Sequence, residues 1–212
     1  MKPRKLNVAV ISDVHLGTYN CHADELLKYL KSIDPKVLVI NGDFVDFLEL
    51  KRSAFPQKHF DVILEIIRKS KSGTKVYYLT GNHDESLRRI SDFEFGNIEI
   101  KNKLVLELNG EKNWFFHGDV FDPLIEKTKC LAQLGSVGYD FLLFFNRQLN
   151  QFLGALGKPR MTLSQKIKKG IKIAHEHVDR FEETAVKFAA KKKYANVICG
   201  HIHMPNIKHY SA

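Results

Sequence analysis

Apolar residues along this chain fall into short runs, and amphipathic segments separate the first three of them. Residues 6–12 (LNVAVIS), 37–40 (VLVI) and 75–80 (KVYYLT) have the length and apolar content of buried strands. Between them, residues 22–33 and 59–71 place apolar side chains at helical spacing, with Asp34-Pro35 and Gly73 as stop signals. The order strand, helix, strand, helix, strand predicts an α/β fold with a mostly parallel sheet.

The pattern changes after residue 97. Residues 98–100, 104–108 and 113–116 are short strand candidates, and Asn109-Gly110 is a hairpin signal between the last two. We therefore predict a more antiparallel second sheet or sheet edge. Residues 122–193 contain no convincing strand and favour two or three helices, before a last strand at 196–199. The 212 residues are predicted to form one domain, 1–212, with a helical cap inserted at about 122–193.

The formal net charge of +9 is concentrated in the middle of the chain. Residues 1–119 hold 18 Lys and Arg against 17 Asp and Glu, whereas residues 120–195 hold 14 against 7. A concentrated basic segment indicates an anionic partner such as a phosphorylated substrate, an acidic membrane surface or nucleic acid. Three widely spaced cysteines argue for a reducing compartment, and neither a signal peptide nor a spanning helix is expected.

Residues able to bind metal ions follow five of the predicted strands. Because loops after neighbouring parallel strands meet at one edge of a sheet, one sheet could bring these side chains together. Mixed carboxylate and imidazole ligands suit manganese, iron or zinc better than magnesium or calcium. The set is too large for one tetrahedral ion and fits two ions ~3.5–4 Å apart, bridged by a carboxylate and a hydroxide. Its members are Asp13, His15, Asp43, Asn82, His83, His117, His201 and His203.

Each of these residues also has an ordinary structural interpretation. Asn41-Gly42 is a turn signal, Asp43 and Asp84 could cap helices, and a single histidine is more often structural than a ligand. A metal-binding role for these residues is favoured because they share one position, after five separate strands. By contrast, His175 and His177 lie in a helical pattern, where residues two apart do not face each other.

The ordered motifs DVHLG, GDFVDF, GNHDE, HGD and GHIH resemble those of the calcineurin-like metallophosphoesterase superfamily, across nearly the whole chain. The resemblance implies a four-layer α/β sandwich with a dinuclear metal site. It implies that Asp13, His15 and His203 bind the first metal and that Asp43 bridges. Asn82, His117 and His201 would complete the coordination of the second metal. His83 would contact the scissile phosphate and assist the leaving group.

A narrower resemblance is carried by the insertion and its flanks, among them GYDF at 138–141, FEE at 181–183 and CGHIH at 199–203. These segments are similar to the UDP-2,3-diacylglucosamine pyrophosphatase group of lipid A synthesis, in the branch that carries GNHDE. The better-studied branch has arginine where His83 stands, so the chain departs from it there. The resemblance implies hydrolysis to UMP and 2,3-diacylglucosamine 1-phosphate. We place Asp46, Asp84 and Asp119 behind the ligands, orienting the histidines.

The insertion suits a lipid-linked substrate on physical grounds. Its aromatic side chains could bury an acyl chain, at ~0.8 kcal/mol per CH₂, and its lysines could hold a diphosphate or anionic headgroups. The alternative is that the aromatic stripe packs on the core while the lysines face solvent. The candidate substrate contacts are Tyr139, Phe141, Phe145, Arg147, Lys166 and Lys169.

The sequence therefore predicts a metal-dependent phosphohydrolase, with manganese as the preferred ion and iron or zinc as alternatives. It is expected in the cytoplasm, peripherally on the inner face of a bacterial cytoplasmic membrane. One alternative is the same chemistry on a nucleotide, phosphodiester or phosphoprotein. Nucleic acid is disfavoured because the basic segment lacks interleaved aromatic residues in a polar groove. A second alternative is a non-catalytic scaffold that binds a membrane or a partner, against which the intact ligand set argues.

Overall fold

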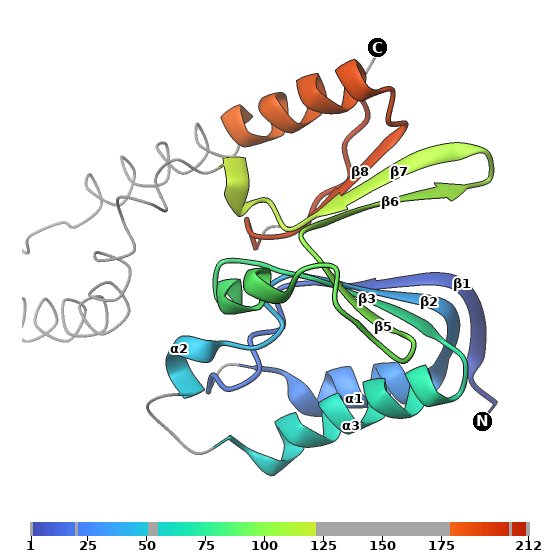
Figure 1. The fold of residues 1–212 in the computed structure, drawn as a ribbon, viewed down its shortest axis with the longest axis vertical. Helices are drawn as coiled ribbons and strands as arrows, with labels where there is room; N and C mark the ends of the chain where they lie inside the picture. The colour runs from blue at the N-terminus through green and yellow to red at the C-terminus, as the bar shows by residue number, and fades with distance from the viewer. Residues whose placement is uncertain (1, 20, 51–54, 122–178, 204, 211–212) are drawn as a thin grey trace, which may run out of the picture. The chain divides into compact units, whose positions relative to one another are not determined.

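The computed structural model describes residues 2–19, 21–50, 55–121, 179–203 and 205–210 (Figure 1). The chain divides into two compact units, one of Met1–Asp119 with Ala185–Ala212 and the other of Val120–Thr184. The first unit holds all of the sheet structure described below. Within the second, the rings of Phe121 and Phe181 meet edge to face. No helix of the described residues is long and apolar enough to cross a membrane.

A five-stranded sheet forms the centre of the first unit. Its strands pair in the order β1-β2-β3-β5-β4, all parallel except β4. Leu38, Val39 and Ile40 in its second strand are almost completely buried, and each contributes about 1.5–3 kcal/mol to folding by that burial. The strands are β1 (Arg4–Ile11), β2 (Ile33–Asn41), β3 (Lys75–Leu79), β4 (Glu94–Phe95) and β5 (Ile98–Lys101).

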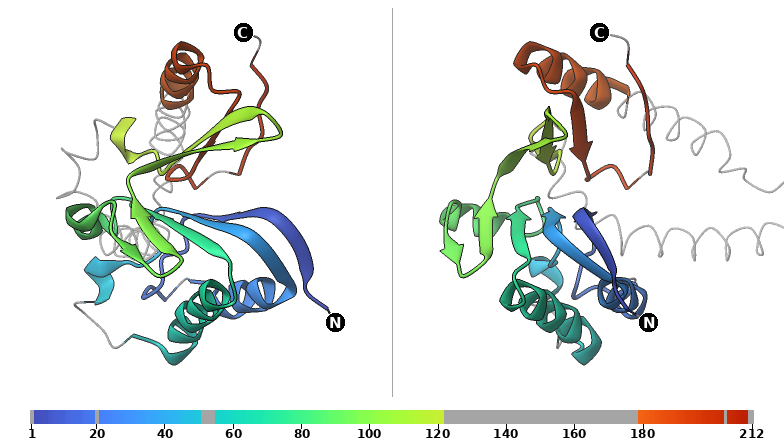
Figure 2. Two further views of the ribbon diagram at one scale, coloured as in Figure 1. Left: turned by 45° about the vertical axis from the view of Figure 1, so that its right-hand side comes forward. Right: turned by 90° about the vertical axis from the view of Figure 1, so that its right-hand side faces the viewer.

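Two helices, α1 (Ala23–Ser32) and α3 (Gln57–Lys71), cover one face of this sheet (Figure 2). Leu30 of α1 and Val62 and Ile66 of α3 join a core cluster with side chains of β1 to β3. Both helices connect strands that run in the same direction, as helical crossovers in a parallel sheet do. A one-turn helix, α2 (Phe47–Leu50), follows the loop after β2.

A second sheet packs against the other face of the first. Its strands are β6 (Lys103–Leu108), β7 (Glu111–Phe116) and β8 (Asn196–Cys199), with β7 in the middle. Val39 and Leu79 of the first sheet and Leu104 and Phe115 of the second share a buried cluster. Residues 179–192 are helical, and Phe188 from this helix packs on Trp114 of β7. The α/β prediction is thus confirmed.

The structure refines the predicted strands in two places. β2 begins at Ile33, directly after α1, so Pro35 lies inside the strand; its position near the strand start tolerates a residue without an N–H. Residues 98–100, for which the sequence left a second sheet or a sheet edge open, belong to β5, which extends the first sheet parallel to β3. The sequence predicts neither α2, of four residues, nor β4, of two, because each is too short to repeat the pattern of its class.

Candidate metal centre

The loops after the parallel strands come together at one edge of the first sheet. Backbone bonds join two of them directly: the N–H of Asp13 donates to the carbonyl of Gly42, and that of His15 to the carbonyl of Asp43, over 3.2 and 2.9 Å. The N–H of Gly200 donates to the carbonyl of His117 over 2.9 Å, which joins the loops after β7 and β8. Side chains from both sheets therefore reach the same place.

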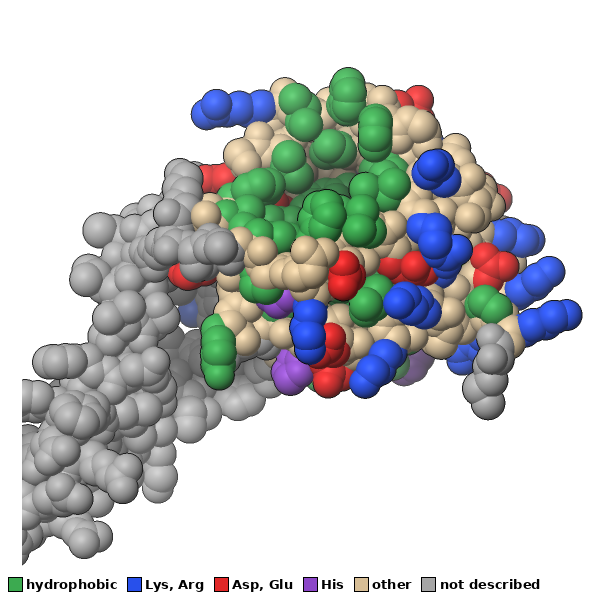
Figure 3. Space-filling model, turned by 90° about the horizontal axis from the view of Figure 1, so that it is seen from below, with side chains coloured by type: hydrophobic (Ala, Val, Ile, Leu, Met, Phe, Trp, Pro, Cys, Tyr) green, Lys and Arg blue, Asp and Glu red, His purple; other side chains and the backbone are tan. Residues whose placement is uncertain are grey.

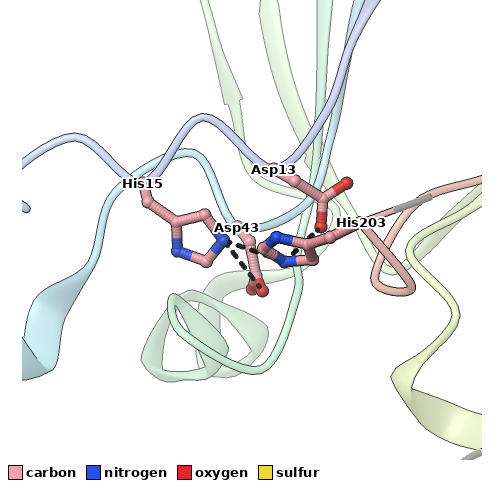
Figure 4. A group of neighbouring side chains, drawn as sticks. All are labelled: Asp13, His15, Asp43 and His203. Atoms are coloured by element: carbon pink, nitrogen blue, oxygen red, sulfur yellow. Dashed lines mark hydrogen bonds and ion pairs between the residues drawn. The ribbon is translucent and has the colours of Figure 1, made fainter. Parts of the chain in front are cut away.

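Four of the predicted ligands form a first cluster, shown pointing toward one another in Figure 4. His203 Nε2 lies 3.4 Å from Asp13 Oδ1 and 3.3 Å from His15 Nε2. His15 Nε2 lies 3.9 Å from Asp43 Oδ2. One ligand atom from each residue lies within 4.8 Å of the others, a spacing that one cation could bridge.

A second cluster shares Asp43 with the first. It consists of Asp43, His117 and His201, again with ligand atoms within 4.8 Å. His117 Nε2 lies 3.1 Å from Asp43 Oδ2 and 3.3 Å from Asn82 Oδ1, so Asn82 borders this cluster too. Asp43 and His117 are both 1% exposed. The structure thus brings all seven predicted ligands together, with the predicted bridging carboxylate common to both groups.

Left-handed backbone conformations concentrate at these positions. Asp13, His15, Asp43, His201 and His203 have φ between 49° and 73°, a region that non-glycine residues adopt rarely. Such conformations cost on the order of 1–3 kcal/mol each and persist where the surroundings impose them, most often at functional sites. Their coincidence with the ligand set is independent support for a binding site at this edge.

Two glycines let the backbone come close to the carboxylates. A Cβ at Gly81 would collide with Asp43 Oδ1, and a Cβ at Gly200 would collide with Ser12 Oγ and Asp13 Oδ2. Close to each glycine in the sequence, a backbone N–H holds the carboxylate in place: His83 N–H donates to Asp43 Oδ1 and His201 N–H to Asp13 Oδ1, both over 2.8 Å. Asp43 thus keeps Oδ2 toward His117, whereas Asp13 Oδ2 also accepts from the Ser12 hydroxyl.

The donor set fits a pair of divalent transition metals. Two carboxylates, one amide and four imidazoles converge on two groups that share one carboxylate. The backbone also prepares His117 for this role, because its Nδ1 lies 3.1 Å from the carbonyl oxygen of Asn41. A carbonyl only accepts, so Nδ1 carries the proton and Nε2 is the atom left to bind a metal.

Without metal, Asp43 and His117 form a charged pair. Burial alone would favour the neutral form of each, but their hydrogen bond and mutual attraction prevail. The pKa of Asp43 lies below its ordinary value, and the pKa of His117 is raised to about 9. The metal-free protein therefore holds a proton on His117 at neutral pH, at the Nε2 atom that would bind a metal.

Metal binding should consequently release a proton from His117. At about pH 7.5 the imidazole is charged before binding and neutral afterwards, so we expect release of ~1 proton, and an affinity that rises with pH up to about 9. Titration calorimetry with Mn²⁺ in two buffers of different ionisation enthalpy measures this number. The His117→Asn variant should lose that release. Equal heats in both buffers for the unmodified protein would contradict the expectation.

His83 and Asp46 lie beside the first cluster. His83 Nδ1 is 2.7 Å from Asp46 Oδ2, and the His83 ring meets that of His15 edge to face at 4.6 Å. The hydrogen bond to Asp46, opposed by burial, raises the pKa of His83. The pKa of Asp46 lies far below its ordinary value, because its hydrogen bonds to His15 and His83 outweigh its burial. His83 is thus oriented through Nδ1, with Nε2 left to act on a ligand.

The other two predicted orienting carboxylates have different partners. Asp84 is fully buried and accepts hydrogen bonds from the N–H groups of Phe44 and Gly81 and from the hydroxyl of Tyr78. Asp119 pairs with Arg88. Asp84 therefore holds the loop backbones after β2 and β3, and Asp119 ties the loop after β7 to residues 85–90. That these two carboxylates orient the ligand histidines stays a prediction.

His59 is a residue of this region that the sequence did not reveal. It lies on α3, is 7% exposed, and accepts a hydrogen bond at Nδ1 from the N–H of Gly17 over 2.9 Å. Burial lowers the pKa of His59, which keeps the ring neutral and Nδ1 able to accept. The bond holds the loop that carries His15. In the sequence His59 only begins a helical pattern, so no signal distinguished it.

Replacing His59 with phenylalanine should loosen that loop. The Gly17 N–H would lose its buried acceptor, at a cost of about 1–3 kcal/mol in unfolding free energy. Misplacement of His15 should weaken Mn²⁺ binding about 10–100-fold, as loss of an outer partner typically does. Calorimetric titration and thermal unfolding measure both effects. His59→Gln, which retains an acceptor, should recover part of the affinity; equal losses in both variants would contradict this role.

The predicted substrate contacts lie outside the described residues, as does most of the predicted cap at 122–193. Tyr139, Phe141, Phe145, Arg147, Lys166 and Lys169 therefore stay predictions.

Comparison with known proteins agrees with this geometry. The family described as calcineurin-like phosphoesterase matches residues 6–205. The DNA polymerase II small subunit of Methanothermobacter thermautotrophicus is 26% identical over 170 residues, 62% of this chain and 34% of that protein. UDP-2,3-diacylglucosamine hydrolases of Neisseria gonorrhoeae and Vibrio vulnificus are 26% and 22% identical over 208 residues, 94% of this chain and 83% and 82% of those proteins.

The chain thus spans about a third of the length of the polymerase subunit and more than four-fifths of the two hydrolases. The family match covers nearly all of the chain, including every loop that contributes to the two clusters. The chain belongs to the calcineurin-like phosphoesterases, a family of hydrolases, and carries their candidate metal site on the ends of its strands.

Proposed function

We propose that this chain is a dinuclear metal-dependent phosphohydrolase whose substrate is UDP-2,3-diacylglucosamine. The observation that carries the chemistry is the pair of ligand clusters joined by Asp43. Asp13, His15 and His203 would hold one ion with Asp43, and Asn82, His117 and His201 the other. When bound, the two ions would supply positive charge to the phosphoryl oxygens and lower the pKa of water toward ~7. Manganese is the proposed ion, with iron and zinc as alternatives.

The protein's own contribution begins with His83. Its Nδ1 is held by Asp46, and the raised pKa keeps the ring able to donate a proton at Nε2 in the neutral range. In this position His83 would stabilise charge on the scissile phosphate and protonate the departing group. Asp43 would keep its negative charge, because its pKa is low despite burial.

The proposed substrate is supported by two relatives that align over 94% of this chain and are named UDP-2,3-diacylglucosamine hydrolases. Hydrolysis at the UMP-side phosphorus would release UMP and 2,3-diacylglucosamine 1-phosphate. The complete fold would be the four-layer sandwich with the cap at 122–193, which would bind the acyl chains. The protein would then work peripherally at the inner face of the cytoplasmic membrane.

A DNA phosphodiester is the alternative substrate. It is favoured by the similarity of 62% of the chain to a DNA polymerase subunit. The ligand clusters would serve either reaction, because both break a bond at phosphorus. The metal chemistry alone therefore does not distinguish between the two substrates.

A side-by-side assay tests the proposal. The full chain, loaded with Mn²⁺, is given UDP-2,3-diacylglucosamine in detergent, a nitrophenyl phosphodiester and single-stranded DNA. We expect UMP and the lipid monophosphate as the main products. The kcat/KM for the lipid substrate should be at least ~100-fold higher than that for either other substrate. Faster cleavage of DNA would reverse the assignment. The Asp43→Asn variant, in which turnover should be about 10³-fold lower, is the control for contaminating enzymes.

A further inference from the structure

An apolar surface lies open beside α3. None of the residues that form it belongs to the two ligand clusters of the metal centre. Phe60 and Leu64 on the outer side of α3 are each 45% exposed, and Phe93 and Phe95 near and in β4 are 55% and 63% exposed. Between them, Ile98 and Ile100 of β5 are only half-buried. We call this set, Phe60, Leu64, Phe93, Phe95, Ile98 and Ile100, the open sheet face.

The strand register shows why these side chains share one face. Ile98 packs against the core cluster to which Val62 and Ile66 of α3 belong, so it points to the helical side of the sheet. Ile100, two residues on, points the same way. Phe95 is paired with Ile98 in the antiparallel β4–β5 ladder and therefore lies on the same side. Among the described residues, α1 and α3 cover β1 to β3, and no α-helix covers β4 and β5 on this side (Figure 2).

The surface is hollowed. Figure 3 shows apolar side chains gathered around a depression on this side of the molecule. The exposed apolar side chains of this region belong to α3, which carries Phe60 and Leu64, and to β4 and its flank, which carry Phe95 and Phe93.

The exposed area is close to what a protein interface needs. Three phenylalanines at 45–63% exposure present on the order of 300 Å² of aromatic surface, before Leu64 and the isoleucines are added. Contiguous patches of about 300–600 Å² often mark interaction sites. A standard interface buries about 800 Å² per partner, and homodimer interfaces are roughly 65% apolar. The open sheet face would therefore supply most of the apolar area of such an interface.

We propose that the open sheet face is the interface of a twofold homodimer, in which α3 of each copy fills the groove of the other. In such an arrangement the same patch serves both partners, so it must contain both complementary shapes. Phe60 and Leu64 supply the ridge, and the β4–β5 side supplies the groove. The partner's α3 would then give β4 and β5 the helical cover that the chain's own described helices do not provide.

The charges around the open sheet face favour a second copy over a membrane surface. Asp24 pairs with Lys58, Glu65 with Arg68, and Glu94 with Lys75. Such internally paired charges leave little net attraction for anionic lipids, which bind surfaces rich in unpaired Lys and Arg. A hollow surface also suits an inserted ridge better than a bilayer, into which apolar side chains must project.

The proposal does not depend on the substrate and is tested on the full chain. Analytical ultracentrifugation from about 1 to 100 µM should show a dimer of twice 24.4 kDa at the upper end. Phe95→Asp and Leu64→Asp should each raise the dimer dissociation constant at least ~30-fold, because each places a charge in the buried core of the interface. Ile207→Asp is the matched control, because Ile207 is 89% exposed and outside the open sheet face.

Circular dichroism and turnover establish that each variant is folded, since none of these residues belongs to the metal centre. A folded, monomeric Phe95→Asp variant beside a dimeric Ile207→Asp variant would support the proposal. A chain that stays monomeric at 100 µM, or a dimer that Phe95→Asp and Leu64→Asp leave intact, would overturn it. Flotation with phosphatidylglycerol vesicles completes the test: a monomer that binds them and loses binding in Phe95→Asp would assign this face to lipid and reject the dimer.

Discussion

Replacing Asp43 with asparagine is expected to lower turnover by about 10³-fold or more, the effect of losing several kcal/mol of charge stabilisation. Asp43 is the one carboxylate common to both ligand clusters, and it is 1% exposed. Asparagine keeps an oxygen that can accept the His83 N–H, so the loop should hold its conformation. The variant loses the negative charge with which Asp43 attracts His117 and would attract both metal ions.

The experiment measures kcat/KM together with bound metal by mass spectrometry. We expect the unmodified chain to bind two equivalents of Mn²⁺ and the variant to bind fewer. Asp92→Asn is the matched control, because its carboxylate is 80% exposed and pairs with Lys101 outside the centre. Near-normal turnover of Asp43→Asn with full metal content would exclude Asp43 as the bridge.

Replacing His83 with glutamine should lower kcat by about 10²–10⁴-fold while metal content stays at the unmodified level. The structure places His83 within reach of His15 and Asp46 in a third group of possible ligands. Our interpretation is that His83 acts on the substrate and does not bind metal. Loss of one metal equivalent in the variant would show instead that His83 is a ligand.

The pH profile gives a second test of His83. Its pKa is raised by Asp46, so the proton-donating form persists to higher pH than in a free histidine, and activity should fall as pH rises through that pKa. Asp46→Asn removes the charge that raises the pKa. The alkaline fall in kcat should therefore move to lower pH, with a 10–100-fold loss in rate. An unchanged profile would argue that Asp46 only packs against the ring.

The sequence was most informative where polar residues follow apolar runs. Asp13, Asp43 and Asn82 stand directly after buried parallel strands, and parallel strands deliver their following loops to one edge of a sheet. That geometry is a property of strand direction, so the convergence of distant residues could be predicted without knowing any contact. The left-handed backbone at Asp13 and Asp43 could not, because neither residue type requires it.

Features that depend on which segments pack together could not be predicted from the sequence. For Ile98 and Ile100 the sequence left a second sheet or a sheet edge open, and only the register with β3 shows that they extend the first sheet. His59 looked like any helical residue until α3 brought it under Gly17. The hydrogen bonds of Asp84 to the N–H groups of Phe44 and Gly81 likewise depend on how the loops after β2 and β3 pack.

The centre is closed by residues 188 positions apart, because the N–H of His201 holds the carboxylate of Asp13. A nascent chain that has been synthesised only as far as the first sheet therefore has Asp13, His15 and Asp43 in reach of one another. It still lacks His201 and His203. Such a nascent or prematurely terminated chain would lack a ligand from each cluster. A chain that ends before residue 201 would therefore be unable to assemble the proposed metal centre.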